Sequence, residues 1–189
     1  MLRIAIVGNI ASGKSTVESF LLEKGYPVLD TDKVAHNLLE EAKSEIILAF
    51  AGYDILDKNE ISRDKLGKLV FKHPNLKKML ESILHPKIRL KIADFCQINH
   101  SSDFVFVSIP LLFEAHMEDL FDKILFIYTD DNIRLERLIK RNGYDEEYAM
   151  CRIKSQLPQE TKLQKADWVI YNNADVESLK KQILNLPIL

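Results

Sequence analysis

The sequence predicts an α/β fold, a three-layer arrangement in which a five-stranded parallel sheet lies between helices. Short apolar runs alternate along the chain with helical patterns, which is typical of parallel strands joined by helical crossovers. A glycine-containing loop, Gly8–Ser15, follows the first apolar run directly and leads into a helix. Between the second and third runs lies a long, mainly helical segment, about residues 33–99, which predicts an insertion of helices.

Five runs have the character of buried strands. Leu2–Val7, Phe104–Ile109 and Lys123–Tyr128 are almost continuously apolar, as expected where helices cover both faces of a sheet. Tyr26–Leu29 and Trp168–Tyr171 are shorter. These runs give the five expected parallel strands.

Four helices are expected around this sheet. In the expected helix Lys14–Lys24, Val17, Phe20 and Leu21 recur at helical spacing and predict an inward-facing stripe. Asn142-Gly143 separates the two expected helices between residues 131 and 155, since this pair favours a turn. The expected helices are Lys14–Lys24, Asp131–Arg141, Asp145–Ser155 and Val176–Leu184.

The helical insertion has three expected breaks. They lie near Gly52–Asn59, at His73-Pro74 and at His85-Pro86, because proline disfavours the helical conformation of the residue before it. The chain is expected to form a single domain. Its expected parts are a core of residues 1–32, 100–136 and 157–189, the insertion of about 33–99, and a lid of about 137–156.

The loop Gly8–Ser15 reads Gly-Asn-Ile-Ala-Ser-Gly-Lys-Ser, the pattern of a phosphate-binding loop. In this pattern backbone N–H groups surround a β-phosphate, Lys14 bridges β- and γ-phosphate oxygens, and the Ser15 hydroxyl binds Mg²⁺. Gly13 permits close approach of the backbone, and the following helix directs its positive end at the anion. The residues expected to contact the nucleotide are Asn9, Ile10, Ala11, Ser12, Gly13, Lys14, Ser15 and Thr16.

Two acids, Asp30 and Asp32, follow the second expected strand. Neighbouring parallel strands present their carboxyl ends to the same crevice, which here is the crevice of the phosphate loop. A carboxylate at that edge is suited to orient or deprotonate an acceptor hydroxyl and to help hold Mg²⁺. The pattern favours Asp32 as a catalytic residue with Asp30 in support; the alternative is that the acids cap the next helix.

Four arginines, Arg134, Arg137, Arg141 and Arg152, lie on the two helices of residues 131–155. A hairpin of helices is suited to close as a lid, and its guanidinium groups would neutralise charge on a transferring phosphoryl group. Arg137 and Arg141 are four residues apart and share a helix face, so we assign them to the lid. Arg134 is expected on the surface, and the alternative for the whole set is a solvated basic face.

Composition restricts partners and compartment. The 189 residues are 47% hydrophobic, enough for one core, and the net charge of -2 gives no general attraction to nucleic acid or to an anionic membrane. Cys96 and Cys151 lie far apart without metal-binding spacing, so reduced thiols and a cytoplasmic protein are expected. We expect neither a signal peptide nor a membrane span, and the oligomeric state is left open.

A phosphate loop alone is shared by kinases, GTPases, motor ATPases and regulatory modules. A GTPase is disfavoured because the sequence has no Asn-Lys-x-Asp, and its DxxG match at Asp64–Gly67 falls within an expected helix. Two alternatives stay open at this point. One is a kinase for some other small molecule, such as a nucleoside or nucleoside monophosphate, and the other is a nucleotide-dependent regulatory module.

Segments along nearly the whole chain make the sequence resemble the dephospho-CoA kinase family. The phosphate loop is the most distinctive of them, and the His-Pro and Pro-Leu-Leu-Phe-Glu segments separate this family from other small kinases. The matching segments are Gly8–Thr16, Val28–Ala35, Ile61–Arg63, Leu84–Ile88, Ile109–Glu114, Arg137-Leu138 with Arg141, Arg152–Pro158 and Ala166–Asn173. The resemblance implies a P-loop kinase fold and transfer of the ATP γ-phosphoryl group to the ribose 3′-hydroxyl of dephospho-CoA, which completes coenzyme A.

The resemblance also implies roles for residues of the core. Asp32 would be the base or aligner of the 3′-hydroxyl, Lys14 and Ser15 would hold phosphates and Mg²⁺, and Arg141 would act in the lid. Asn173 would lie near adenine; an Asn pair such as Asn172-Asn173 is otherwise most often a turn.

The family's helical insertion is where the coenzyme A portion would dock, with Arg63, His85 and Lys87 as the polar candidates. His85 has the alternative of a helix-terminal residue before Pro86. The phosphate loop departs from the family pattern because Asn9 and Ala11 stand where glycine is usual, which predicts a stiffer loop. No Asp ends the Phe104 strand, so Mg²⁺ would be held by Ser15, water and the acids at 30 and 32, with Glu114 as an outside candidate.

Overall fold

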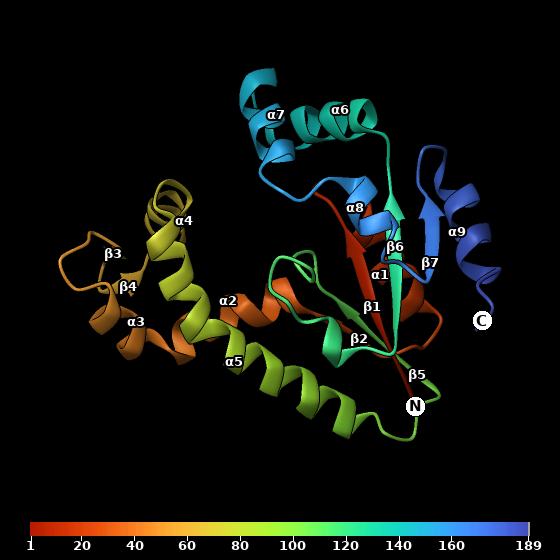
Figure 1. Ribbon diagram of the computed structural model, residues 1–189, viewed down its shortest axis with the longest axis horizontal. Coiled ribbons are helices and arrows are strands. Elements are labelled where there is room, and N and C mark those ends of the chain that lie inside the picture. The colour runs from red at the N-terminus through yellow and green to blue at the C-terminus, as the bar shows by residue number, and fades with distance from the viewer. Residues whose placement is uncertain (189) are drawn as a thin grey trace. The chain divides into compact units, whose positions relative to one another are not determined.

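The computed structural model describes residues 1–188, and the chain divides into two compact units (Figure 1). The first unit is made of Met1–Asp30 and the chain from Cys96 onward, and the second is Thr31–Phe95. The second unit overlaps the segment in which the sequence predicts an insertion of helices.

Residues 1–188 place a five-stranded sheet in the first unit, with the strand order β2-β5-β1-β6-β7. Every neighbouring pair in it is parallel. The strands are β1 Leu2–Gly8, β2 Val28–Asp30, β5 Phe104–Ser108, β6 Lys123–Tyr128 and β7 Trp168–Tyr171. The predicted α/β class and all five predicted strands are confirmed. The loop that follows β1 therefore leaves the middle of the sheet.

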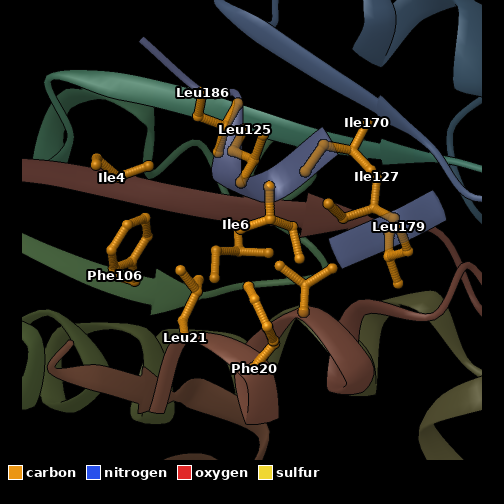
Figure 2. Close-up of a cluster of buried hydrophobic side chains, with 12 residues drawn as sticks. Ile4, Ile6, Phe20, Leu21, Phe106, Leu125, Ile127, Ile170, Leu179 and Leu186 are labelled. Atoms are coloured by element: carbon orange, nitrogen blue, oxygen red, sulfur yellow. The ribbon is translucent and has the colours of Figure 1, made fainter. Parts of the chain in front are cut away.

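The central strand β1 is buried on both faces because helices cover the sheet. Its Ile4 and Ile6 face α1 (Lys14–Glu23) and α9 (Val176–Leu184), and Figure 2 shows them in one cluster with Phe20, Leu21 and Leu179. Phe20 and Leu21 belong to the stripe that the sequence predicted. Burying side chains of this size contributes roughly 1.5–3 kcal/mol each, so α1 is fixed firmly against the sheet.

Further helices connect β6 to β7 in the first unit. Gly143 ends α6 in the left-handed conformation with φ 66, and its N–H donates to the carbonyl of Ile139 at 2.8 Å, which confirms the predicted turn at this residue. The helices are α6 Asp131–Asn142, α7 Glu146–Lys154 and α8 Gln159–Leu163, and a 3₁₀ turn, Glu118–Leu120, precedes β6. The five-residue α8 and the 3₁₀ turn were not predicted.

The second unit is mainly helical and contains one small antiparallel hairpin. The predicted break near Gly52–Asn59 is confirmed, because the hairpin begins within it, and His73 separates two helices as expected. The elements are α2 Thr31–Glu41, α3 Lys43–Ala49, β3 Leu56–Asp57, β4 Glu60–Ile61, α4 Arg63–Lys72 and α5 Pro74–Ile98, the last of which runs on into the first unit.

The third predicted break was wrong, since α5 continues through Pro86 without ending. A proline inside a helix removes one backbone hydrogen bond and costs about 3 kcal/mol. Ile83, Leu84 and Ile88 are buried on either side of it. Their burial offsets the cost of the proline, a contribution from tertiary packing that local sequence rules do not include. Within residues 1–188, no helix is long and apolar enough to cross a lipid bilayer.

Candidate active site

The phosphate loop turns sharply between the end of β1 at Gly8 and the start of α1 at Lys14. Ala11 has φ 62 and Gly13 has φ 88, both in the left-handed region. The Ser12 N–H donates to the carbonyl of Asn9 at 3.0 Å and closes the turn. Within residues 1–188, no side chain caps α1 at Gly13, so its first-turn N–H groups are suited to an anion. Ala11 bears left-handed strain that a glycine would avoid, and the expected stiffness of the loop stays a prediction.

The back of the loop is held by Asn172, which directly follows β7. The Asn172 Nδ2 donates to the carbonyl of Ser12 at 2.8 Å, and the Asn172 carbonyl accepts from Arg137 Nη2 at 3.1 Å. A Cβ on Gly13 would lie only 2.1 Å from Asn172 Nδ2, so the loop requires glycine at this position. The sequence pointed to the Asn pair only through the family resemblance, and the role of Asn172 as a support for the loop was missed.

Asn9 and Ile10 are tied to the segment that follows α7. Asn9 Nδ2 donates to the carbonyl of Leu157 at 3.0 Å, and the Ile10 N–H donates to Gln156 Oε1 at 2.7 Å. The loop is thus anchored from two directions, at Ser12 by Asn172 and at its first residues by Gln156 and Leu157.

Lys14 points to an acid one helical turn further along α1. Its Nζ lies 2.8 Å from Glu18 Oε1 and also donates to Ser108 Oγ, at the end of β5. Glu18 is 8% exposed and Ser108 is fully buried. Neither partner was predicted from the sequence, although the spacing of four residues between Lys14 and Glu18 indicates a contact on one helix face.

The second predicted acid pair follows β2. Asp30 is the last residue of that strand and lies opposite Ser108 in the parallel register. Asp32 comes two residues later, exposed in the first turn of α2. Two residues span at most about 7 Å of chain, so the connection keeps Asp32 close to the carboxyl end of β2.

The hairpin of α6 and α7 packs on the phosphate loop, and in Figure 1 it lies beyond the carboxyl ends of β1 and β6. Leu138, Ala149 and Ile153 form its buried cluster, and Ile10 and Ala11 of the loop pack against that cluster. This arrangement places the predicted lid segment next to the phosphate loop. Movement of the segment stays a prediction.

The arginines of α6 have three different surroundings. Arg137 lies against the phosphate loop through its bond to the carbonyl of Asn172. Arg141 is exposed, and its Nε donates to Asn142 Oδ1 at 2.8 Å. Arg134 is only 2% exposed, so the expectation that it lies on the surface was wrong. The reason is its place four residues before the buried Leu138, which puts both on the inward face of α6.

Arg134 is a buried cation whose acidic partner, Asp131, is exposed. The Arg134 Nη2 donates to Asp131 Oδ1 at 2.6 Å. A second buried cation, Lys162, lies 2.7 Å from Glu114 Oε1. Burial lowers the pKa of Lys162, and the hydrogen bond and charge of Glu114 oppose that change. Glu114, the outside candidate for binding Mg²⁺, therefore forms an ion pair with Lys162 and also accepts a hydrogen bond from the Leu157 N–H.

The polar candidates for acceptor binding lie in the second unit. Arg63 is the exposed first residue of α4, and Lys87 on α5 forms an ion pair with Glu45 at 3.0 Å. His85 lies in the middle of α5 and not at a helix terminus, because the helix continues through Pro86. It is half-buried, and this burial is the main reason that its pKa is lowered.

Asn173, predicted to lie near adenine, uses its side chain inside the protein. Its Oδ1 accepts a hydrogen bond from the Asp130 N–H at 2.9 Å. This bond links the segment after β7 to the start of α6.

Comparisons with known proteins show which family the sequence and the fold resemble. A sequence model of the family described as "Dephospho-CoA kinase" matches residues 2–178. A protein named dephospho-CoA kinase from Oceanobacillus iheyensis is 42% identical over 97% of this chain and 94% of its own length.

Two solved structures are similar along almost the whole chain. TT1252 from Thermus thermophilus has a TM-score of 0.86 at 34% identity, covering 97% of this chain and 94% of its own. Dephospho-CoA kinase from Campylobacter jejuni has a TM-score of 0.72 at 34% identity, covering 96% and 93%.

Proposed function

The chain belongs to the dephospho-CoA kinase family, and on that premise we propose that it transfers the γ-phosphoryl group of ATP to the ribose 3′-hydroxyl of dephospho-CoA. The products are coenzyme A and ADP. The observation that carries the proposal is the match of residues 2–178 to the family. The loop Gly8–Ser15 supports it, because its sequence follows the phosphate-loop pattern and its Gly13 has no room for a Cβ.

The nucleotide is held by the phosphate loop and the start of α1. In this proposal the first-turn N–H groups of α1 bind the β-phosphate, and Lys14 leaves Glu18 to bridge the β- and γ-phosphate oxygens. Arg137, which lies against the loop, is placed to neutralise phosphate charge. Arg141 acts only when the hairpin of α6 and α7 closes.

The residues present fit a magnesium ion of the kind that phosphate-loop enzymes use. Among residues 1–188 there is no cluster of three or more acids, histidines or cysteines that would enclose a metal. Mg²⁺ keeps several waters and takes much of its coordination from nucleotide phosphates, so it needs only one or two protein oxygens. Ser15 supplies a hydroxyl in the first turn of α1, and Asp32 is the proposed acid. When bound, the ion neutralises charge on the β- and γ-phosphates.

Asp32 is the proposed aligning base. It accepts the proton of the ribose 3′-hydroxyl while the 3′-oxygen attacks the γ-phosphorus. The bond from that phosphorus to the oxygen bridging the β- and γ-phosphates breaks, and ADP leaves with the electron pair. The short connection from Asp30 at the end of β2 supports this role, because it keeps the acid near the edge of the sheet where the phosphate loop begins.

The helical unit is proposed to receive the coenzyme A portion, with Arg63, His85 and Lys87 as polar contacts. Lys87 already pairs with Glu45, so binding of an anion there requires this ion pair to open. The protein is proposed to act in the cytoplasm, which the two free thiols, Cys96 and Cys151, support.

A panel of acceptors tests the proposed function. Purified protein is given ATP and Mg²⁺ with, separately, dephospho-CoA, adenosine, AMP, CMP and shikimate, and release of ADP is followed. We expect turnover with dephospho-CoA to exceed that with every other acceptor. Best turnover with AMP or CMP would assign the chain to the nucleoside monophosphate kinases instead.

A further inference from the structure

Glu18 brings a carboxylate from α1 to the carboxyl end of β5. Its Oε1 accepts hydrogen bonds from Lys14 Nζ and from Ser108 Oγ, the latter at 2.5 Å. Ser108 is the last residue of β5 and pairs in register with Ile6 of β1 on one side and with Asp30 of β2 on the other. The Glu18 side chain is about one-tenth exposed, so its position is fixed by these partners.

The place that Glu18 reaches is one where phosphate-loop enzymes need negative charge. In phosphate-loop NTPases an Asp at a strand end helps to hold the magnesium ion. Here β5, the strand next to β1, ends in a serine that carries no charge, and Ile109 and Pro110 follow. Through its hydrogen bond with the Ser108 hydroxyl, Glu18 brings a carboxylate to this strand end.

Helical spacing puts Glu18 in line with the groups that hold phosphate and metal. Lys14 and Glu18 are four residues apart on α1, and Ser15 and Glu18 are three apart, so the Glu18 side chain neighbours both of the others. The proposed Mg²⁺ ligand, the phosphate lysine and the carboxylate are therefore neighbours on a single rigid helix.

Burial requires that Glu18 keep a positive partner when nucleotide binds. In the structure that partner is Lys14, at 2.8 Å. Once Lys14 turns to the phosphates, the carboxylate would be left with the neutral Ser108 hydroxyl, and an uncompensated buried charge is costly. A hydrated magnesium ion held at Ser15 would supply the missing positive charge, and its waters would offer hydrogen-bond donors to the Glu18 carboxylate.

We propose that Glu18 is the positioning residue for magnesium in this protein. It accepts a hydrogen bond from a water on the ion. From its position on α1, it has the role that an Asp at a strand end has in phosphate-loop NTPases. Ser108 holds the carboxylate in the required orientation. This inference rests on the proposed function only for the binding of ATP and Mg²⁺, and it is independent of the identity of the acceptor.

The test measures magnesium-dependent nucleotide binding in the absence of any acceptor. A fluorescent ADP analogue is titrated into the full-length protein, once in EDTA and once across a Mg²⁺ series, for the wild type and for Glu18→Gln. The Gln variant keeps the shape of the side chain and removes its charge. We expect its affinity in EDTA to stay within about threefold, while the Mg²⁺ concentration that gives half of the enhancement rises about 10- to 100-fold, as for other partners of metal ligands.

Relocation of the carboxylate makes the test specific. Glu18→Ala should lose the Mg²⁺ enhancement, and the double variant Glu18→Ala/Ser108→Asp should regain most of it, since the acid then stands at the strand end itself. Glu23→Ala, which removes an exposed acid from the same helix, should behave as wild type. Melting temperatures identify any variant that is not folded. If the two variants with Glu18→Ala do not fold, the result for Glu18→Gln decides the test.

Two results would overturn the proposal. One is an unchanged Mg²⁺ series in a folded Glu18→Gln protein. The other is an equal loss of affinity with and without Mg²⁺, which would mean that Glu18 acts only by holding Lys14. Because no acceptor is present, neither result depends on whether dephospho-CoA is the substrate.

Discussion

Asn172, just after the last strand of the sheet, donates its side-chain amide to the carbonyl of Ser12 in the phosphate loop at 2.8 Å. The two residues are far apart in sequence, and their contact leaves room for no side chain on Gly13. Correct loop geometry therefore depends on the packing of the whole sheet, and this dependence leads to the first prediction.

Gly13→Ala should weaken nucleotide binding at least about tenfold. The substitution adds left-handed strain of roughly 1–2 kcal/mol and drives a methyl group into the Asn172 amide. Gly25→Ala is the matched control, because Gly25 has a similar φ of 84 but no atom near its Cβ position within 4 Å. The control should lose stability and retain affinity in an equilibrium titration with ADP. Equal loss of ADP affinity in both variants would show that left-handed backbone strain, and not the clash with Asn172, causes the loss.

Asp32→Asn should reduce kcat with dephospho-CoA by about 10² to 10⁴, because the amide no longer accepts the hydroxyl proton. Nucleotide affinity measured in EDTA, without Mg²⁺, should change little, since the phosphate loop is intact. The control is Asp57→Asn, which removes an exposed acid at the end of β3. Near-normal kcat in Asp32→Asn would remove this residue from the mechanism.

Glu114→Gln should lower the free energy of unfolding by about 3–5 kcal/mol, because it leaves the buried ammonium of Lys162 without its charged partner. The comparison is Asp64→Asn, which breaks the pair with Lys68 on the surface of α4 and should cost less than about 1 kcal/mol. Urea unfolding of both variants measures the difference. Similar costs for the two variants would mean that burial does not decide the strength of these pairs.

His85 should make the protein less stable in mild acid. Its pKa in the folded protein is lowered, chiefly by burial, so below about pH 6.5 the unfolded chain binds a proton more readily than the folded one. The stabilising contribution is therefore present above that pH and is lost as the pH falls through this range. His85→Gln should lose less stability than wild type between pH 7.5 and 5.5 in urea unfolding. The exposed His100→Gln should follow wild type, and a steeper pH dependence in His85→Gln would contradict the assignment.

The sheet was predictable because its strands are short apolar runs in a regular order with helices. Such runs reflect burial on both faces, which is a property of each segment by itself. The continuation of α5 through Pro86 was not predictable in this way, because the packing of Ile83 and Ile88 outweighs the local preference of proline.

In the candidate site, the turn between β1 and α1 was predictable because one local pattern, Gly8–Ser15, specifies it. Contacts between residues that are distant in the sequence were not predicted. The bond between Glu18 and Ser108 and that between Asn172 and Ser12 each link residues whose proximity only the strand order creates. Arg134 was wrongly assigned to the surface because charged side chains are usually exposed to solvent. It lies four residues before the buried Leu138, and this spacing places it on the inward face of α6.

The most direct test of the proposed transfer locates the phosphate in the product. Purified protein is incubated with ATP, Mg²⁺ and dephospho-CoA, and the product is examined by phosphorus NMR and mass spectrometry. We predict a single new phosphomonoester on the ribose 3′-oxygen, which is coenzyme A, formed together with one ADP per transfer. Phosphate at another position, or ATP hydrolysis that leaves dephospho-CoA unchanged, would contradict it.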